Sequence, residues 1–268
     1  MNLLKNFKPQ AIIFDKDGTL IDFDLMWGSW TLGLADRLQN SIGLDVRQAL
    51  CECYGYDMAR RKILPDGKLT CTPMWRLREL MVEVLTSLGI PAAEASCAVA
   101  HAWHVPDPVT LAKPFTDIQK LFLNIHKLGI KIAIATTDDR DPTRAMFEAF
   151  GAQDLITTMV CADDGIRAKP APDMVTAICQ RMNVDPCNVL VIGDTVADLQ
   201  MARCAGAGYV IGVLSGVGSL ANLTPLADIL IDTVDTIQES FILKEQTQTQ
   251  RLEPDEGLPG WNPDPAYS

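Results

Sequence analysis

The chain has 268 residues, of which 48% are hydrophobic, enough for one large α/β domain or a core domain with an insert. Its formal net charge of −11 disfavours nucleic acid and anionic membranes as partners. The first ten residues lack the apolar stretch of a signal peptide, and no run of about 18 apolar residues is present. We therefore expect a cytoplasmic protein without nucleic-acid or membrane partners, and either a monomer or a homodimer.

The eight cysteines form no CxxC pair, and no histidine cluster accompanies them. A structural zinc site is therefore not expected. Reduced and mostly buried thiols, as in a cytosolic protein, are the simpler interpretation.

Short apolar runs, each followed by a helix breaker, predict buried parallel strands. Four runs are clear and two are weaker, namely Ala11–Phe14, Lys131–Ala135, Val189–Ile192 and Tyr209–Val213, then Leu155–Val160 and Ile229–Ile231. Stretches that predict helices lie between them, at Thr116–Lys127, Pro142–Phe150, Pro172–Met182 and Ala197–Ala205. This alternation predicts an α/β fold with a doubly wound, Rossmann-like parallel sheet, which binds ligands at the carboxyl ends of its strands.

The stretch from Phe23 to Val109 interrupts the alternation, because it carries no convincing strand pattern and predicts several helices. Since it lies between the first two strands, we interpret it as an α-helical domain inserted into the core. Residues 1–22 and 110–243 then form the core and residues 23–109 the insert. Residues 244–268 are polar and contain several prolines, and we expect them to be disordered.

Two carboxylates follow the first predicted strand, in the sequence Phe14-Asp15-Lys16-Asp17-Gly18-Thr19. At a strand end followed by glycine, both can face a ligand. One carboxylate can attack phosphorus and form an aspartyl-phosphate. The other can protonate the leaving oxygen and later deprotonate the attacking water. The same residues also suit an ordinary acidic turn, so this motif alone leaves the function open.

Two further acids, Asp194 and Asp198, open a predicted helix after the strand that begins at Val189. Helix capping and the helix dipole favour acids there, but they explain one acid better than two. Together with Asp15 and Asp17, these acids would gather at one edge of the sheet, where so much negative charge requires a cation. Oxygen ligands with room for water and a phosphate oxygen suit Mg²⁺.

A third group of candidates lies between these two motifs. Thr136 and Thr137 end a predicted strand, where a hydroxyl and backbone N–H groups could hold a phosphoryl oxygen. Lys169 precedes a Pro-x-Pro turn that would hold its ammonium near the transferring phosphoryl charge. Taken alone, the threonine fits a plain strand end equally well, and a single lysine is more commonly an ordinary solvated side chain.

The order of DxDGT, a strand-terminal Thr, KPxPD and GDxxxD resembles the haloacid dehalogenase (HAD)-like hydrolase superfamily over most of the chain. The insert looks like the type 1 helical cap of its subfamily I, and the sequence as a whole most resembles phosphoglycolate-phosphatase-like members. The resemblance implies that Asp15 is the nucleophile and Asp17 the general acid/base, with Thr136 and Lys169 binding the phosphoryl group. It also implies Mg²⁺ as cofactor, held by Asp15, Asp17, Asp194 and Asp198.

Because Asp17 is present, the resemblance leaves phosphoester hydrolysis or phosphoryl transfer between sugar hydroxyls, since dehalogenases and phosphonate-cleaving members lack that acid. Hydrolysis of a small phosphorylated metabolite is favoured, because no sequence feature demands the return of phosphate that a sugar phosphomutase needs. A non-catalytic binding module with this fold is a third possibility.

The substrate itself is poorly specified. The insert is rich in Trp and Met, which predicts either its own hydrophobic core or an apolar wall for a terpenoid or isoprenoid phosphate. Arg60, Arg61 and Lys62 could instead bind a second anion, or form the solvated face of a helix. The candidate substrate-binding residues are Gly18, Thr19, Thr137 and Arg60.

Overall fold

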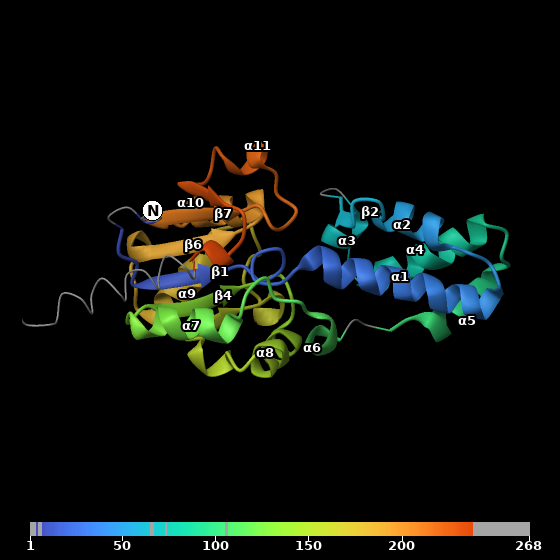
Figure 1. Ribbon diagram of the computed structural model, residues 1–268, viewed down its shortest axis with the longest axis horizontal. Coiled ribbons are helices and arrows are strands. Elements are labelled where there is room, and N and C mark those ends of the chain that lie inside the picture. The colour runs from blue at the N-terminus through green and yellow to red at the C-terminus, as the bar shows by residue number, and fades with distance from the viewer. Residues whose placement is uncertain (1–3, 5–6, 65–66, 73, 105–106, 238–268) are drawn as a thin grey trace, which may run out of the picture.

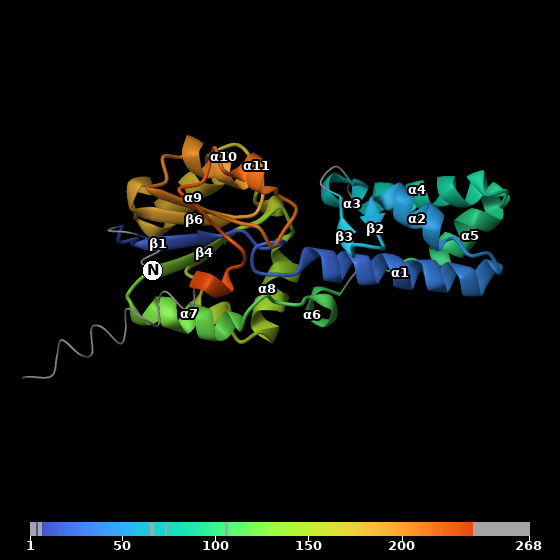
Figure 2. The same ribbon diagram turned by 45° about the horizontal axis from the view of Figure 1, so that its top comes forward.

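The computed structural model describes residues 4, 7–64, 67–72, 74–104 and 107–237, so the predicted tail at 244–268 lies outside the described residues. Figures 1 and 2 show an α/β lobe beside a smaller, mostly helical lobe. The chain passes from the first lobe into the second after the first strand and returns before the second strand of the sheet.

Six parallel strands form the sheet of the α/β lobe, in the order β5-β4-β1-β6-β7-β8. Their bounds are β1 Ala11–Phe14, β4 Lys131–Ala135, β5 Thr158–Val160, β6 Val189–Gly193, β7 Tyr209–Val213 and β8 Ile229–Ile231. The chain winds outward from β1 through β4 to β5, and then adds β6, β7 and β8 on the other side of β1. This topology confirms the predicted doubly wound sheet and leaves a crevice for ligands at the carboxyl end of β1.

Helices cover both faces of the sheet, which is why its strands are apolar throughout. On one face, Ile12 and Phe14 pack against α7 (Ile118–Lys127) and α8 (Arg140–Ala149). On the other, Ala11 and Ile13 pack against α9 (Asp173–Met182) and α10 (Val196–Cys204). The remaining helical elements of this lobe are α11 Leu220–Leu223, η1 Gln153–Leu155, η2 Ala162–Asp164 and η3 Pro186–Asn188.

The helical lobe, here called the cap, has a hydrophobic core of its own. Its helices are α1 Phe23–Ile42, α2 Arg47–Tyr54, α3 Lys68–Cys71, α4 Met74–Ser87 and α5 Ala92–Ala102, and α6 (Pro108–Leu111) follows them on the return to the α/β lobe. The buried ring of Trp30 stacks on Tyr54, whose hydroxyl donates a hydrogen bond of 2.8 Å to the Leu77 carbonyl. A separate core of this kind supports an independent lobe, while its boundaries at residues 22 and 110 stay a prediction.

The cap also contains a short β-hairpin that the sequence did not reveal. Strands β2 (Tyr56–Asp57) and β3 (Lys62–Ile63) pair antiparallel, so the expectation of a cap without strands is wrong. Two-residue strands are too short to produce a recognisable alternation. The hairpin is tied to α1, because the Asp24 carboxylate accepts the Ile63 N–H at 2.7 Å and contacts the Lys62 ammonium at 2.6 Å.

All cysteines whose side chains are described are free thiols. Only Cys51, Cys161 and Cys179 among them are buried, so the expectation of mostly buried thiols is wrong. In the described part of the chain, no helix combines the length and the apolar character needed to cross a bilayer.

Candidate active site

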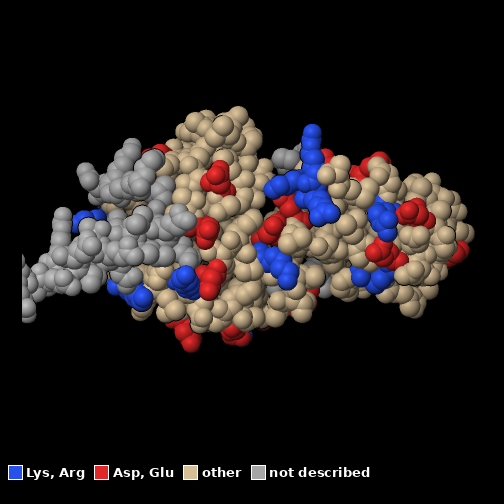
Figure 3. All heavy atoms as spheres, viewed as in Figure 1, with Lys and Arg blue, Asp and Glu red and all other residues tan. Residues whose placement is uncertain are grey.

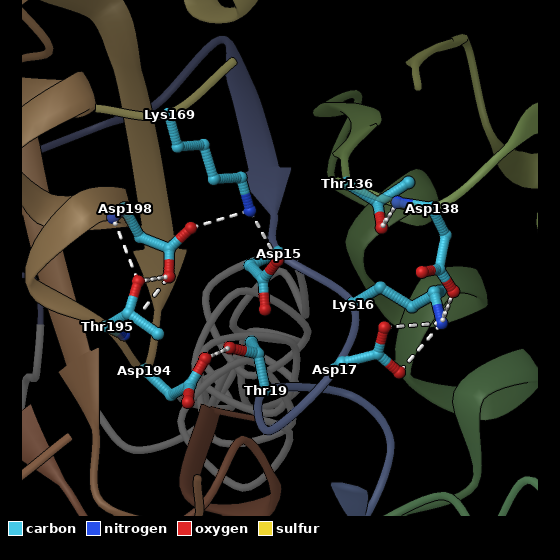
Figure 4. Close-up of polar contacts among 10 residues, drawn as sticks. All are labelled: Asp15, Lys16, Asp17, Thr19, Thr136, Asp138, Lys169, Asp194, Thr195 and Asp198. Carbon is cyan, nitrogen blue, oxygen red and sulfur yellow. Dashed lines mark hydrogen bonds and ion pairs between the residues drawn. The ribbon is translucent and has the colours of Figure 1, made fainter. Parts of the chain in front are cut away.

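Acidic and basic side chains from four loops meet at the carboxyl ends of the central strands (Figure 4). Asp15 follows β1 directly, and its backbone N–H donates to the Ile192 carbonyl of β6 at 2.9 Å. The chain then turns sharply at Gly18, whose φ of +84° is favourable only for glycine. The turn keeps Asp15 and Asp17 at the same edge of the sheet, as the first motif predicts.

Lys169 lies between two carboxylates from different strands. Its Nζ is 2.5 Å from Oδ1 of Asp15 and 2.6 Å from Oδ1 of Asp198. All three side chains are at most 10% exposed. Burial opposes the charged form of Lys169, but the two carboxylates outweigh it and raise the pKa of the ammonium. Lys169 therefore stays protonated and brings a permanent positive charge to Asp15.

Asp198 belongs to the N-terminal capping box of α10. Its Oδ2 accepts hydrogen bonds from the N–H and the hydroxyl of Thr195, at 3.0 and 2.5 Å. In return, the Asp198 N–H donates to the Thr195 hydroxyl at 3.1 Å. This arrangement leaves Oδ1 of Asp198 free to face Lys169. Capping and the ion pair thus use different oxygens of one carboxylate.

Asp194 is held by the loop that follows β7. Its Oδ2 accepts the Val217 N–H at 2.9 Å, and its Oδ1 lies 3.4 Å from the Thr19 hydroxyl. A Cβ on Gly216 would overlap Oδ2 of Asp194, and one on Gly218 would overlap its backbone carbonyl. This loop was missed from the sequence, although its Gly-Val-Gly pattern after a predicted strand was an available signal.

Three buried carboxylates converge closely enough to share one cation. One oxygen each from Asp15, Asp194 and Asp198 lies within 4.8 Å of the others. Burial raises the pKa of Asp15 to about 7, and the charge of Asp198 adds to this effect against the opposing charge of Lys169. Burial also raises the pKa of Asp194 well above its usual value. One ammonium does not balance three acids, so the set fits a divalent cation with oxygen ligands.

Asp17 is not part of this carboxylate triad. Its two oxygens each lie 2.7 Å from Nζ of Lys16, which also contacts Asp138 at 2.8 Å. Burial raises the pKa of Asp17, with Lys16 opposing the shift. In Figure 4 its carboxylate points toward Lys16 rather than toward the triad. Sequence reasoning missed the part that Lys16 and Asp138 play in holding this acid.

The residues predicted to bind the phosphoryl group and the substrate do not all lie at the cavity. Thr136 is buried, and its hydroxyl accepts the Asp138 N–H at 3.1 Å, while Thr137 is exposed and lines the central cavity. The buried Thr19 contacts Asp194, and the carbonyl of Gly18 accepts the Ser215 hydroxyl at 2.7 Å. Arg60 lies on the turn between β2 and β3, with its side chain 79% exposed, and is not among the described residues that line the cavity.

A cavity of about 950 Å³ lies between the cap and the α/β lobe, which is a usual size for a ligand site. Asp15, Asp17, Lys169, Asp194 and Asp198 line its floor. The cap contributes six side chains from α1, α3, α4 and the turn between α3 and α4: Phe23, Trp27, Leu69, Thr72, Met74 and Leu77. The arrangement can hold an anionic group at the floor and an attached group against the cap.

Comparisons with known proteins show the family of this chain and relatives of similar sequence and fold. A family model of haloacid dehalogenase-like hydrolases matches residues 9–206. A phosphoglycolate phosphatase of Rhodospirillum rubrum is 26% identical, over 76% of this chain and 79% of that protein. An N-acetylmuramic acid 6-phosphate phosphatase of Pseudomonas aeruginosa is 23% identical, over 76% and 81%. The crystal structure of a HAD family hydrolase of Deinococcus radiodurans, with bound phosphate and sodium, has the same fold, with a TM-score of 0.60, 18% identity and coverage of 90% and 98%.

Proposed function

Because the chain belongs to the haloacid dehalogenase-like hydrolase family, we propose that it is a Mg²⁺-dependent phosphatase that hydrolyses a small phosphate monoester. The family match confirms the resemblance drawn from the four motifs. The phosphatases among its relatives support the reaction class. The observation that carries the proposal is the pairing of Asp15 with Lys169 beside two further buried acids.

Asp15 is the proposed nucleophile. One of its oxygens faces Lys169, which leaves the other available to attack phosphorus. A bond forms between this oxygen and phosphorus, and the bond from phosphorus to the alcohol oxygen breaks. Asp17 gives a proton to the departing alcohol. Water then attacks the aspartyl-phosphate while Asp17 takes back a proton, which releases inorganic phosphate and restores Asp15.

The positive charge that this reaction needs comes from two sources. Lys169 would contact the phosphoryl oxygens as they gain charge, because its ammonium already lies at the floor of the cavity. Asp15, Asp194, Asp198 and the backbone carbonyl of Asp17 would hold Mg²⁺, which supplies charge neutralisation to the phosphate when bound. The Thr136 hydroxyl, whose oxygen accepts the Asp138 N–H, would donate a hydrogen bond to a phosphoryl oxygen.

The cap supplies the upper wall of the cavity, so its movement toward the α/β lobe would exclude water from the reacting group. The same acids would also serve a sugar phosphomutase, and a non-catalytic module would retain the fold without turnover. Release of inorganic phosphate from β-glucose 1-phosphate, with no isomer formed, separates hydrolysis from mutase activity.

The test is phosphate release from a panel of phosphate monoesters, with and without Mg²⁺. The wild type is expected to turn over members of the panel only with the metal. Asp15→Asn is expected to lower kcat by about 10³-fold or more, because it removes the nucleophile. Asp154→Asn, an exposed change outside the cavity, is the matched control. Full activity of Asp15→Asn would contradict the proposal.

A further inference from the structure

The two walls of the cavity differ in chemical character. Five of the six described side chains that the cap contributes are apolar, and Thr72 is the exception. Phe23 and Trp27 lie on the first turns of α1, where their rings pack at a centroid distance of 5.9 Å. Among the described lining residues, the cap thus offers apolar and aromatic surface and no cation.

The wall formed by the α/β lobe is acidic beyond the needs of the proposed reaction. Asp138 and Asp139 line the cavity next to Thr137, in addition to Asp15, Asp17, Asp194 and Asp198. Asp138 is paired with the buried Lys16. Asp139 is exposed and, among the described residues, its carboxylate has no ion pair or hydrogen bond. It therefore presents to the cavity a negative charge that no described side-chain cation balances.

The charges around the cavity do not leave room for a second anion. Six carboxylates line it, and Lys169 is the single cation among the described lining residues. A divalent metal ion and the phosphate dianion of the substrate would largely cancel each other. A carboxylate on the leaving group would then lie near Asp139, and the described lining of the cap offers it no ammonium or guanidinium.

The alternative source of positive charge is the β2–β3 hairpin. Figure 3 shows basic side chains near the junction of the two lobes, on the outer surface. On the hairpin, Lys62 is paired with Asp24, and Arg60 is 79% exposed and 3.8 Å from Asp57. The segments of the cap outside the described residues, at 65–66, 73 and 105–106, contain no lysine or arginine. Arg60, Arg61 and Lys62 of the hairpin are all exposed, and none of them is among the described residues that line the cavity.

Given the phosphatase function proposed above, we infer that the substrate is a phosphate monoester of an alcohol that carries no second negative charge. An apolar face of its leaving group packs against Phe23, Trp27 and Met74. The negative charge of Asp139 repels anionic leaving groups. Asp139 is thus a specificity-determining residue. The inferred class differs from phosphoglycolate, whose leaving group carries a carboxylate.

The test compares kcat/KM for phenyl phosphate and 4-carboxyphenyl phosphate, which share the aromatic ring and the ester oxygen. The wild type with Mg²⁺ is expected to favour the phenyl ester by about tenfold, which is the scale of one partly screened charge repulsion. Asp139→Asn is expected to raise kcat/KM for the carboxyphenyl ester more than for the phenyl ester, which narrows the ratio of the two kcat/KM values. Asp141→Asn removes an exposed charge outside the cavity and should leave the ratio unchanged.

Two outcomes would overturn the inferred exclusion of anionic leaving groups while the phosphatase function stands. One is a wild type that hydrolyses the carboxyphenyl ester as well as the phenyl ester, with no effect of Asp139→Asn. The other is a selective loss of the carboxyphenyl reaction in Arg60→Ala, which would assign anion binding to the hairpin. If the protein hydrolyses neither ester and no other phosphate monoester, both the phosphatase function and the exclusion of anionic leaving groups are overturned.

Discussion

The ammonium of Lys169 lies 2.5 Å from a carboxylate oxygen of Asp15, although 154 residues separate the two in the chain. Both side chains are at most 10% exposed, and Lys169 also contacts Asp198. A buried lysine shared between two acids keeps its charge and holds both carboxylates in fixed positions.

Lys169→Met should remove the ammonium and keep much of the side-chain volume. We expect kcat to fall by about 10²–10³-fold, because the phosphoryl charge loses its fixed cation and Asp15 loses a contact. Arg167→Met removes a nearby exposed cation, 77% exposed and paired with Asp173, and should retain activity. Steady-state kinetics at saturating Mg²⁺ provide the measurement, and equal losses in the two variants would contradict a specific role for Lys169.

Gly216→Ala should weaken metal binding without replacing a proposed metal ligand. The new Cβ would overlap Oδ2 of Asp194, so the loop or the carboxylate must move. We expect the apparent affinity for Mg²⁺ to fall by about 10–100-fold, as is usual when the support of a metal ligand is disturbed. Isothermal titration with Mg²⁺ measures this directly.

The control for that variant is Gly33→Ala, in helix α1, where an added Cβ meets only the end of the Arg37 side chain at 3.4 Å. It should bind Mg²⁺ like the wild type. Unchanged affinity in Gly216→Ala would show that the loop after β7 does not position Asp194.

Lys16→Met should impair the acid role of Asp17. Without Lys16, the Asp17 carboxylate loses both of its 2.7 Å contacts and lies near Asp138 without a cation. We expect a loss of kcat of about 10²-fold for alkyl phosphates, whose leaving group needs a proton. For 4-nitrophenyl phosphate, whose leaving group departs as an anion, the loss should be clearly smaller.

A uniform loss in Lys16→Met on both substrate types would instead indicate a general structural defect. Circular dichroism and the thermal midpoint of the variant show whether the fold is retained. A retained fold with equal losses on both substrates would contradict the positioning role.

Asp164 provides a pH-dependent test of stability away from the site. Burial opposes its charged form, but hydrogen bonds from Arg140, with two contacts of 2.6 Å, lower the pKa of Asp164. A lowered pKa in the folded state stabilises the protein above the unfolded pKa of about 3.9, and this stabilisation is lost as pH falls through the folded value.

Asp164→Asn should therefore lower the free energy of unfolding at pH 7. The difference in this free energy between the variant and the wild type should shrink as pH falls below about 4. Urea denaturation at pH 7 and at pH 3 measures both differences. Asp141→Asn, with a side chain 88% exposed, is the control and should match the wild type at both pH values. A difference for Asp164→Asn that does not change with pH would contradict this account.

The α/β core was predictable because its signals are local. The runs at Ala11–Phe14, Lys131–Ala135 and Tyr209–Val213 are strands with the predicted bounds, since strands buried on both faces must be apolar throughout. The run at Leu155–Val160 was too long, because residues 153–155 form the 3₁₀-helix η1 and the strand begins at Thr158. The β2–β3 hairpin was missed, since its strands depend on the contacts of Ile63 and Lys62 with Asp24 of α1 more than on their own sequence.

The site was predictable where a motif follows a strand. Asp15, Asp194 and Asp198 meet as expected, because the ends of the neighbouring parallel strands β1 and β6 share one edge of the sheet. Lys169 reaches them from the loop that precedes α9. Contacts made by backbone groups could not be inferred, such as the Val217 N–H that binds Asp194. The charges of Arg60 and Lys62 suggested an anion site on a helix, but these residues lie on a hairpin whose turn no periodicity predicted.

Transfer of the phosphoryl group to Asp15 is the central claim, and trapping that intermediate tests it most directly. The wild type with Mg²⁺ is mixed with a substrate carrying labelled phosphate, quenched rapidly in acid, digested and analysed by mass spectrometry. We expect an acid-stable, hydroxylamine-sensitive phosphoryl group on Asp15, and no labelled peptide in Asp15→Asn. A label on a different residue, or turnover by Asp15→Asn at the wild-type rate, would contradict the mechanism.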